Sequence, residues 1–497
     1  MTIAAFAYAY GRLALLNEAH LNNGLDLGIL HQLVWRISRG SLPESSLKGF
    51  ILWGDHANFL LYVLVPFYRL FPDVRTLLVS QAVAGTIAAW PLFRVAWAAT
   101  RNAFFAYVIL FASLLFWGLQ NALDFDVHAP IFVIAPLAWF LYGLYFRRPV
   151  LTGGALAAGL LAQEDAAAMF AATGIFLLFT RRRRWGVWIA LTSVVYLLVI
   201  GYLVMPRYTP GGTPLVHFDI GEYPGGPVRR TFGALTHPAR TFRMATDHPE
   251  KVDTLKSLFR AWGYLPLFSP FTLVSFLPSF ISRFLSLEDL RWVRAYHYNA
   301  PTFPLFAFGA ILVTARISRW VTKGIAQRLT PLVASTACAL LVAAGTYASS
   351  IRNRDLPLWK LANARFTDRP YFPEHAAHLV RGIRGVIPPN AAVSVASGFV
   401  GMFSNRKRVH VFPNLPSTGV PTWIVTSDQF NTWPLAKGEM AEAIDRLRSD
   451  PAYEVIWDEY AIVVAKPRPR DRGAQRPPSA PSLRAAPNAD RPPSAEE

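Results

Sequence analysis

Carboxylates and imidazoles recur in the short segments that separate the apolar runs of this 497-residue chain. Asp26 stands in the first of these segments, and Asp55 and His56 directly precede the apolar run 59–71. Such groups are costly to place at a membrane boundary without a partner, which favours a functional role. The alternative is that each carboxylate caps a helix. In a functional role, Asp26 would act as a general base, and Asp55 and His56 would orient a substrate or a cation.

A second acidic segment, residues 120–128, carries Asp126 and His128. A carboxylate two residues from an imidazole predicts either a pair of ligands for a divalent cation or a pair for proton transfer. The spacing matches no strict metal signature, so Asp126 and His128 are only candidate ligands for a divalent cation. The alternative is that an outer loop of a membrane protein is simply poor in Lys and Arg.

A third acidic segment interrupts the apolar run 150–180, where Glu164 and Asp165 follow Gln163. Two adjacent acids inside such a run are hard to explain as solvated groups, because hydrocarbon offers no partner for them. The sequence therefore predicts a helix break near Gln163, with acids that line a polar cavity and bind substrate.

A basic and aromatic group precedes the apolar run 300–316 and consists of Arg291, Arg294, His297 and Tyr298. Guanidinium and imidazole groups at the outer surface predict a contact with a lipid phosphate or pyrophosphate. The alternative is an interfacial anchor, since arginines and aromatic residues also gather where a helix enters the membrane.

The composition identifies the kind of scaffold that must position these residues. The chain is 53% hydrophobic and only 16% charged, and 49 basic against 31 acidic residues give a net charge of +18. These values exclude an ordinary soluble enzyme and predict a polytopic membrane protein. The sequence contains no Walker loop, dinucleotide-binding glycine motif, zinc-binding cysteine pair or HExxH, so soluble-cofactor chemistry has no support.

Apolar runs long enough to cross a bilayer predict about ten transmembrane helices. The clearest are residues 76–98, 103–119, 129–146, 150–180 as two short helices, 186–205, 300–316 and 329–348. Residues 3–16 are too short and are interpreted as the remnant of a first span. Three prolines interrupt residues 258–285, and the sequence leaves open whether this segment crosses twice or dips in and returns.

Four connections between these runs predict the orientation. They hold twelve basic residues and no acidic one, namely Arg94 and Arg101, Arg147 and Arg148, Arg181 to Arg184, and Arg316, Arg319, Lys323 and Arg328. By the positive-inside rule these connections face the cytoplasm, which explains much of the basic charge without nucleic acid as a partner. Residues 17–75, 120–128 and 206–260 are then outer loops, and 206–260 is expected to form a lid rather than a span.

The pattern changes after residue 350, where the predicted transmembrane domain 1–350 ends. Short β-like runs and an amphipathic helix predict a small soluble α/β domain at 351–465 on the extracytoplasmic face. Residues 466–497 are rich in Pro and Arg and have no apolar period, which predicts a disordered tail.

With these residues in order, the chain resembles the domain of unknown function 2079 family of predicted polytopic membrane proteins, from about residue 17 to residue 466. The resemblance rests on residues 24–40, 54–56 with 66–68, 125–128, 163–165, 297–300 and 392–413. The family in turn is similar to integral-membrane glycosyltransferases of type C, which take a sugar from a polyprenyl-phosphate carrier. The resemblance implies a helical membrane fold of that type.

The resemblance also implies roles for individual residues. Asp26 matches the essential acid of the first outer loop, and Asp126 is the candidate for a second catalytic acid. Relatives tend to carry Lys where this chain has Gln163, so the contact with the carrier phosphate must pass elsewhere or be lost, and Arg291, Arg294 and His297 are the candidate substitutes. The second loop also departs from the family, which tends to place Phe-His-Pro there.

The first interpretation is therefore a multi-pass glycosyltransferase of the bacterial plasma membrane that moves a hexosyl or pentosyl group on the extracytoplasmic face. Its partners would be membrane lipids, a polyprenyl-phosphate sugar donor and a cell-envelope glycan or protein acceptor. The second interpretation is a transporter or lipid-handling protein without catalysis, because membrane acids also line ion and substrate paths. The sequence leaves open whether the protein is an enzyme.

Overall fold

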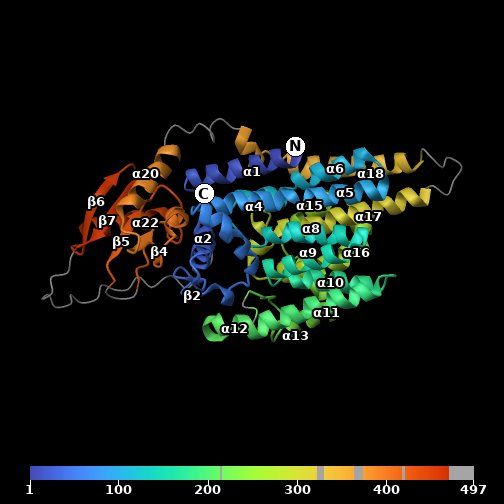
Figure 1. The fold of residues 1–497 in the computed structure, drawn as a ribbon, viewed down its shortest axis with the longest axis horizontal. Coiled ribbons are helices and arrows are strands. Elements are labelled where there is room, and N and C mark those ends of the chain that lie inside the picture. The colour runs from blue at the N-terminus through green and yellow to red at the C-terminus, as the bar shows by residue number, and fades with distance from the viewer. Residues whose placement is uncertain (213–214, 216, 322–329, 363–372, 417–419, 469–497) are drawn as a thin grey trace. The chain divides into compact units, whose positions relative to one another are not determined.

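The structure is a computed structural model that describes the chain except residues 213–214, 216, 322–329, 363–372, 417–419 and 469–497 (Figure 1). The predicted tail 466–497 therefore lies almost wholly outside the described residues. The chain forms two compact units. The first contains residues 1–14, 51–63 and 79–367, and the second contains residues 15–50, 64–78 and 368–497.

The first unit is built from helices. They are α1 (Thr2–Ala19, which ends in the second unit), α4 (Arg75–Ile87), α5 (Ala89–Thr100), α6 (Ala103–Leu114), α7 (Trp117–Asp124), α8 (Ile131–Phe146), α9 (Pro149–Ala162), α10 (Ala166–Leu178), α11 (Arg183–Val199), α12 (Met205–Tyr208), α13 (Pro227–Thr236), α14 (Pro238–Ala245), α15 (Pro249–Arg260), α16 (Pro270–Phe284), α17 (Phe303–Val321) and α18 (Thr330–Thr346). In Figure 1, α8, α9, α10 and α11 lie one below the next.

Within the described residues, five helical stretches are long and apolar enough to cross a membrane. They are Arg75–Thr100, Ala103–Asp124, Arg183–Tyr208, His297–Val321 and Pro331–Ile351. Four shorter apolar helices accompany them, namely Phe59–Leu70, Ile131–Phe146, Pro149–Ala162 and Ala166–Leu178. The predicted fold class, an α-helical polytopic membrane protein, is confirmed.

The helix break predicted near Gln163 is present in the structure. α9 ends at Ala162, Gln163 is extended with φ −162° and ψ 143°, and α10 starts at Ala166. Glycines hold the flanking hairpins closely packed. A Cβ on Gly143 in α8 would lie 2.5 Å from the Thr152 hydroxyl in α9, and a Cβ on Gly174 in α10 would lie 2.5 Å from a backbone nitrogen of α11. The short polar segment 163–165 is thus fixed between two tight helix pairs.

The outer segment 206–260, expected to be a lid, contains three short helices, α13, α14 and α15. Each has a proline in its first turn, where the missing N–H leaves no hydrogen bond unmade. The segment 258–285, which the sequence left open, contains the end of α15, the 3₁₀ turn Leu265–Phe268 and the helix α16.

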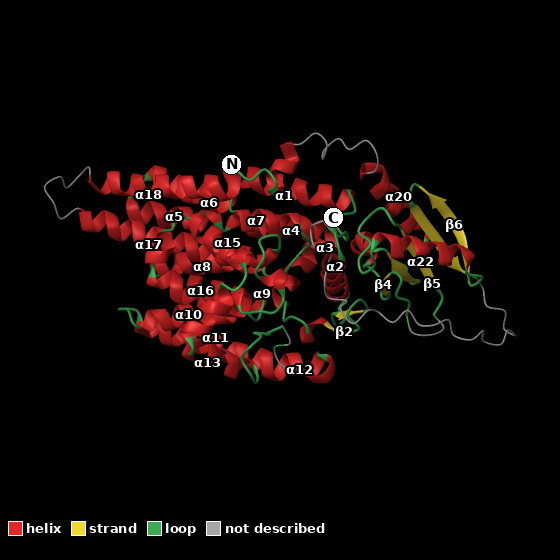
Figure 2. Cartoon of the chain, turned by 180° about the vertical axis from the view of Figure 1, so that it is seen from behind, coloured by secondary structure: helices red, strands yellow, loops and turns green. Residues whose placement is uncertain are grey.

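The second unit is an α/β structure. Its helices are α2 (Leu25–Ser38), α3 (Val65–Leu70), α20 (Pro373–Val386), α21 (Val400–Phe403) and α22 (Lys437–Ser449). The short strands β1 (Glu44–Ser45) and β2 (Phe50–Ile51) pair with each other. The main sheet contains β3 (Ala392–Val395), β4 (Val409–Val411), β5 (Thr422–Thr426), β6 (Tyr453–Glu459) and β7 (Ile462–Pro467), drawn as yellow arrows in Figure 2.

The main sheet has the strand order β4-β3-β5-β7-β6. β3 is parallel to β4 and β5, whereas β7 is antiparallel to β5 and β6. Successive side chains of a strand point to opposite faces, so Ile424 packs with Ile444 of α22 while Val425 packs with Val380 of α20. This sheet confirms the small C-terminal α/β region. The predicted domain boundaries stay predictions, and the second unit also includes residues 15–50 and 64–78.

Candidate functional site

A carboxylate clamp joins the segment around residues 55–57 to the helix break in the first unit. Nδ1 of His56 lies 2.7 Å from Oε1 of Glu164, and the backbone N–H of Ala57 donates to Oε2 of the same carboxylate at 3.0 Å. The Glu164 side chain is only 5% exposed. The structure therefore brings together two residues that the sequence singled out separately, and it gives the buried carboxylate two partners.

A second acid–imidazole contact lies beside the clamp. Nε2 of His217 lies 2.7 Å from Oδ1 of Asp55, and the rings of His217 and His56 stack with their centroids 4.4 Å apart. Gly54 permits this arrangement, because a Cβ at that position would collide with the backbone of Tyr208. Sequence reasoning missed His217. His217 stands alone in a segment rich in Gly and Pro, so its only signal in the sequence was an imidazole in a predicted outer loop.

Asp55, His56 and His217 each offer one ligand atom, and these atoms all lie within 4.8 Å of one another. Two imidazoles and a carboxylate suit a divalent transition metal. Glu164 completes the arrangement, because a carboxylate on one ring nitrogen orients the other nitrogen of a histidine toward a metal. No other such group of three occurs among the described residues. Metal binding by Asp126 and His128 stays a prediction.

The charges of this cluster shift the pKa values of its members. Burial lowers the pKa of His56, but the charge and hydrogen bond of Glu164 outweigh it and raise that pKa to about 9. Burial raises the pKa of Glu164, and the charge and hydrogen bond of His56 reverse the effect and hold it below its usual value. Burial and the charge of His56 lower the pKa of His217. At neutral pH His56 is therefore protonated and Glu164 is ionised, so the two form a charged pair.

Asp165 differs from its neighbour Glu164 because part of its side chain is accessible. The protein packed around Asp165, and then the negative charge of Glu164, raise the pKa of its carboxyl to about 6. The charges of His56 and Arg291 act in the opposite direction. An accessible acid that titrates near neutral pH is suited to proton transfer.

The predicted phosphate-binding arginines already have carboxylate partners. Nε of Arg291 lies 2.6 Å from the Glu288 carboxylate, and Nη1 of Arg294 lies 3.2 Å from the Asp253 carboxylate. The Arg294 guanidinium also lies over the ring of Trp117, 4.8 Å from its centroid. The positive charge of Arg291 nevertheless acts on Asp165, so this arginine belongs to the electrostatic surroundings of the helix break.

Three predicted site residues form a stack of rings, namely His128 of the acidic segment 120–128 and His297 and Tyr298 of the group that precedes residue 300. His297 lies on His128 with centroids 3.7 Å apart, and Tyr298 contacts the His297 ring at 4.1 Å. Buried Asp126 is held through its backbone, because Nε2 of Gln81 donates to its carbonyl while Oε1 of Gln81 accepts from the His128 N–H. The structure thus brings His128 and His297 together, although the sequence placed them in separate groups.

Asp26 belongs to the second unit, where it stands in the first turn of α2. The residue that caps this helix is Gly24, and no side chain makes a capping hydrogen bond. The capping role considered for Asp26 is therefore wrong. A carboxylate in the first turn is still favoured by the helix dipole. Its catalytic role stays a prediction.

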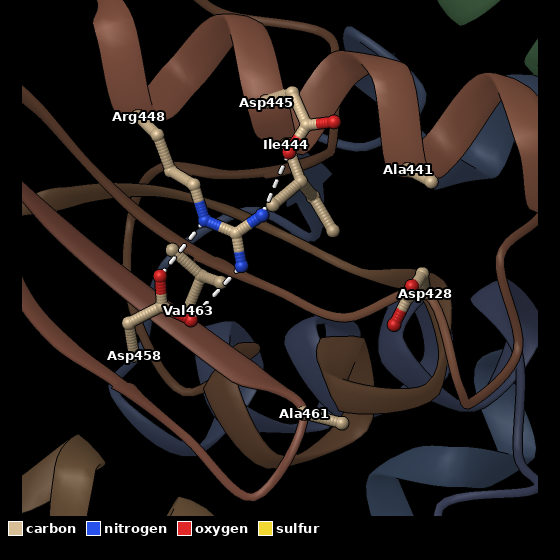
Figure 3. A pocket seen from close by; sticks show the side chains of 8 residues that line it. All are labelled: Asp428, Ala441, Ile444, Asp445, Arg448, Asp458, Ala461 and Val463. Carbon is tan, nitrogen blue, oxygen red and sulfur yellow. Dashed lines mark hydrogen bonds and ion pairs between the residues drawn. The ribbon is translucent and has the colours of Figure 1, made fainter.

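The second unit also contains a pocket of about 250 Å³ (Figure 3). Its centre is Arg448 of α22, whose guanidinium is bound by Asp445 at 2.7 Å and by Asp458 at 2.8 and 3.0 Å. Asp428 also lines it. The guanidinium is already shared by two carboxylates and Asp428 adds a third, so the pocket has an acidic lining.

These features define a mostly helical polytopic membrane protein with a small C-terminal α/β region. The chain belongs to the DUF2079 family, described as predicted membrane proteins, whose model matches residues 17–464. No protein in the curated collection that was compared matches it. Its fold is similar to crystal structures of ArnT from Cupriavidus metallidurans. The structure bound to undecaprenyl phosphate gives a TM-score of 0.51 at 15% identity, covering 93% of this chain and 97% of ArnT. The apo structure gives 0.51 at 14% identity, with coverages of 94% and 98%.

Proposed function

We propose that the protein transfers a sugar from a polyprenyl-phosphate donor to an acceptor at the extracytoplasmic face of the bacterial plasma membrane. The observation that carries the proposal is the cluster of Asp55, His56, Glu164 and His217 at a break between apolar helices. The shared fold with ArnT, solved with undecaprenyl phosphate, supports a lipid-linked donor. The acceptor would be a cell-envelope glycan or protein, and residues 351–465 would lie outside the membrane and select it.

In the proposed reaction, Asp26 accepts the proton of an acceptor hydroxyl, and that oxygen attacks the anomeric carbon of the sugar. The bond from this carbon to the phosphate oxygen breaks, and the electron pair leaves with the polyprenyl phosphate. Attack opposite the leaving group inverts the anomeric centre. Arg294 and His297 offset the charge that develops on the phosphate, while Asp126 orients the acceptor.

The acid–imidazole cluster would supply positive charge only with a cation bound, because the charges of protonated His56 and Glu164 offset each other and Asp55 adds an acid. A divalent cation on Asp55, His56 and His217 would supply charge stabilisation near the phosphate. His56 would then be neutral, with its ring held by Glu164. Glu164 fixes the ring in both states, and Asp165 remains the accessible acid of the group.

The test of the transfer proposal is Asp26→Asn in membrane vesicles supplied with a labelled polyprenyl-phosphoryl hexose or pentose. We expect transfer to fall at least about 100-fold, because a general base typically contributes 10²–10⁴-fold. Asp450→Asn, an exposed position in the second unit, is the matched control and should keep full activity. Transfer by Asp26→Asn at the control rate would refute the mechanism.

The cation proposal has its own test in metal binding by the purified protein. His217→Ala removes one of three ligands, so we expect affinity for Zn²⁺ or Mn²⁺ to fall at least about 10-fold. The control is His410→Ala in the second unit, which lies outside the cluster. Equal metal binding by both variants would remove the cation from the proposal and leave sugar transfer untouched.

Transport is the second candidate function, and the acids at the helix break favour it, because broken helices often line transport paths. Cysteine labelling separates the two functions after the buried Cys338 is replaced by alanine. If the protein transfers sugar on one face, the cysteine of an Asp165→Cys variant should react with a labelling reagent only from the extracytoplasmic side. Reaction from both sides would favour transport.

A further inference from the structure

Two buried amide side chains flank the carboxylate clamp without a hydrogen-bond partner for their oxygens. Asn58 and Gln163 are each only 5% exposed. Oδ1 of Asn58 and Oε1 of Gln163 are buried, and neither accepts a hydrogen bond from any described residue. Most buried polar atoms in proteins are paired, so an unpaired amide oxygen on each of the two segments that Glu164 joins needs a reason.

The clamp joins the two chain segments that carry these amides. Glu164 binds both the His56 ring and the Ala57 N–H. Asn58 directly follows Ala57, and Gln163 directly precedes Glu164. The Cα atoms of Asn58 and Gln163 are thus about 3.8 Å from those of the clamp residues Ala57 and Glu164. Both amides stand on segments that a single carboxylate holds together.

A comparison with Gln120 in the same unit shows what a structural glutamine looks like. Nε2 of Gln120 donates to the carbonyls of Leu115 and Ser350, and its Oε1 accepts from the N–H of Leu358. A buried amide oxygen without a donor destabilises the fold, and it is tolerated where a ligand completes the bond. The chemistry that suits two amides is a ligand with several O–H donors.

We propose that Asn58 and Gln163 form a subsite that binds hydroxyl groups of a sugar. This inference rests on the proposed function and specifies how the sugar of the donor is recognised. Amide oxygens accept hydrogen bonds from hydroxyl groups and amide N–H groups donate to them. A pair of amides can therefore recognise the hydroxyl groups at two positions of a sugar ring. Such a site discriminates strongly against an analogue that lacks the hydroxyl, because the buried amide is then left unpaired.

The experiment compares binding of two probes to the full-length protein in nanodiscs. The first is a polyprenyl phosphate that carries one sugar, tested as a set of hexoses and pentoses, and the second is the bare polyprenyl phosphate. We expect wild type to bind at least one sugar-carrying lipid about 10-fold or more tightly than the bare lipid. Asn58→Leu and Gln163→Leu should abolish that preference and leave affinity for the bare lipid within about twofold.

Thermal unfolding separates binding from a structural role. Replacing an unpaired buried amide by a leucine is expected to be neutral or stabilising, whereas replacing a paired one removes bonds. Gln163→Leu and Asn58→Leu should therefore keep or raise the Tm, and the control Gln120→Leu should lower it. A loss of Tm in Gln163→Leu equal to that in Gln120→Leu would overturn the inference.

The outcomes also separate this inference from the proposed function. Sugar preference that is lost in both leucine variants, in a protein that transfers no sugar, would refute catalysis and keep the subsite. Transfer that continues with unchanged sugar preference in both variants would refute the subsite and keep catalysis. Equal binding of all sugar-carrying and bare lipids by wild type would overturn the subsite directly.

Discussion

One buried glutamine in each unit shows two different uses of the same side chain. Gln32 in the second unit is fully buried, and its amide donates to Oγ of Ser46 and the carbonyl of Arg406 while accepting from the Ser46 N–H. Gln163 in the first unit is buried with its oxygen unpaired. A satisfied amide specifies a fold, whereas an unsatisfied one lowers stability unless something binds it.

The histidines repeat this contrast. His31 in the second unit is fully buried, with Nδ1 2.7 Å from the Gly401 carbonyl and Nε2 2.7 Å from the Tyr68 hydroxyl. Burial lowers its pKa to about 4, so the ring is neutral. His56 in the first unit has a pKa of about 9 and is charged. The second unit uses polar groups to hold its packing, and the first unit keeps charge available at the helix break.

The largest expected effect tests the clamp against a matched ion pair of the second unit. The His56–Glu164 pair has side chains 31% and 5% exposed, and the Arg381–Glu18 pair has side chains 27% and 4% exposed. Glu164→Gln and Glu18→Gln should each lower stability by about 2 to 3 kcal/mol, since either leaves a partly buried partner charge uncompensated. Denaturation of both variants checks this expectation.

Activity separates the two glutamine variants. Per folded molecule, we expect Glu164→Gln to lose at least about 10-fold in sugar transfer, because the His56 ring is no longer oriented, and Glu18→Gln to keep the wild-type rate. If both variants lose transfer equally at equal stability, the contrast between the units fails.

The next effect concerns pH and the second unit. The pKa of His31 is lowered to about 4 in the folded protein, against an ordinary value of 6.5. As pH falls below 6.5 the unfolded state takes up the proton first, so stability is full above that pH and falls until about pH 4. Between pH 7 and pH 5 we expect a loss of about 2 kcal/mol.

Hydrogen exchange of α2 and α21, corrected for the intrinsic rate at each pH, measures the His31 effect. His31→Phe is the control, because it has no titrating group at this position and should flatten the pH dependence. Protection in wild type that does not change between pH 7 and pH 5 would show that the ring is not held neutral by its packing.

The contrast between the units also marks how far the sequence could predict the site. Adjacent Glu164 and Asp165 in an apolar run required a helix break, and the break lies where it was expected. His217 could not be found in this way, because it meets Asp55 across 162 residues of sequence. Likewise, the Asp253 partner of Arg294 lies 41 residues away. Local patterns predict polar groups that the apolar surroundings cannot accommodate, while long-range pairing depends on tertiary packing.

The smallest expected effect concerns the pocket around Arg448 (Figure 3). Its ion pairs with Asp445 and Asp458 are partly exposed, with Arg448 at 45%, and exposed pairs contribute about 1 kcal/mol or less. Arg448→Ala should therefore lower stability by at most about 1 kcal/mol, and sugar transfer should stay unchanged. Thermal unfolding and the vesicle assay check both expectations. If Arg448→Ala abolished transfer at unchanged stability, the pocket would be a substrate-binding site, and unpaired polar groups would no longer distinguish functional from structural regions in this protein.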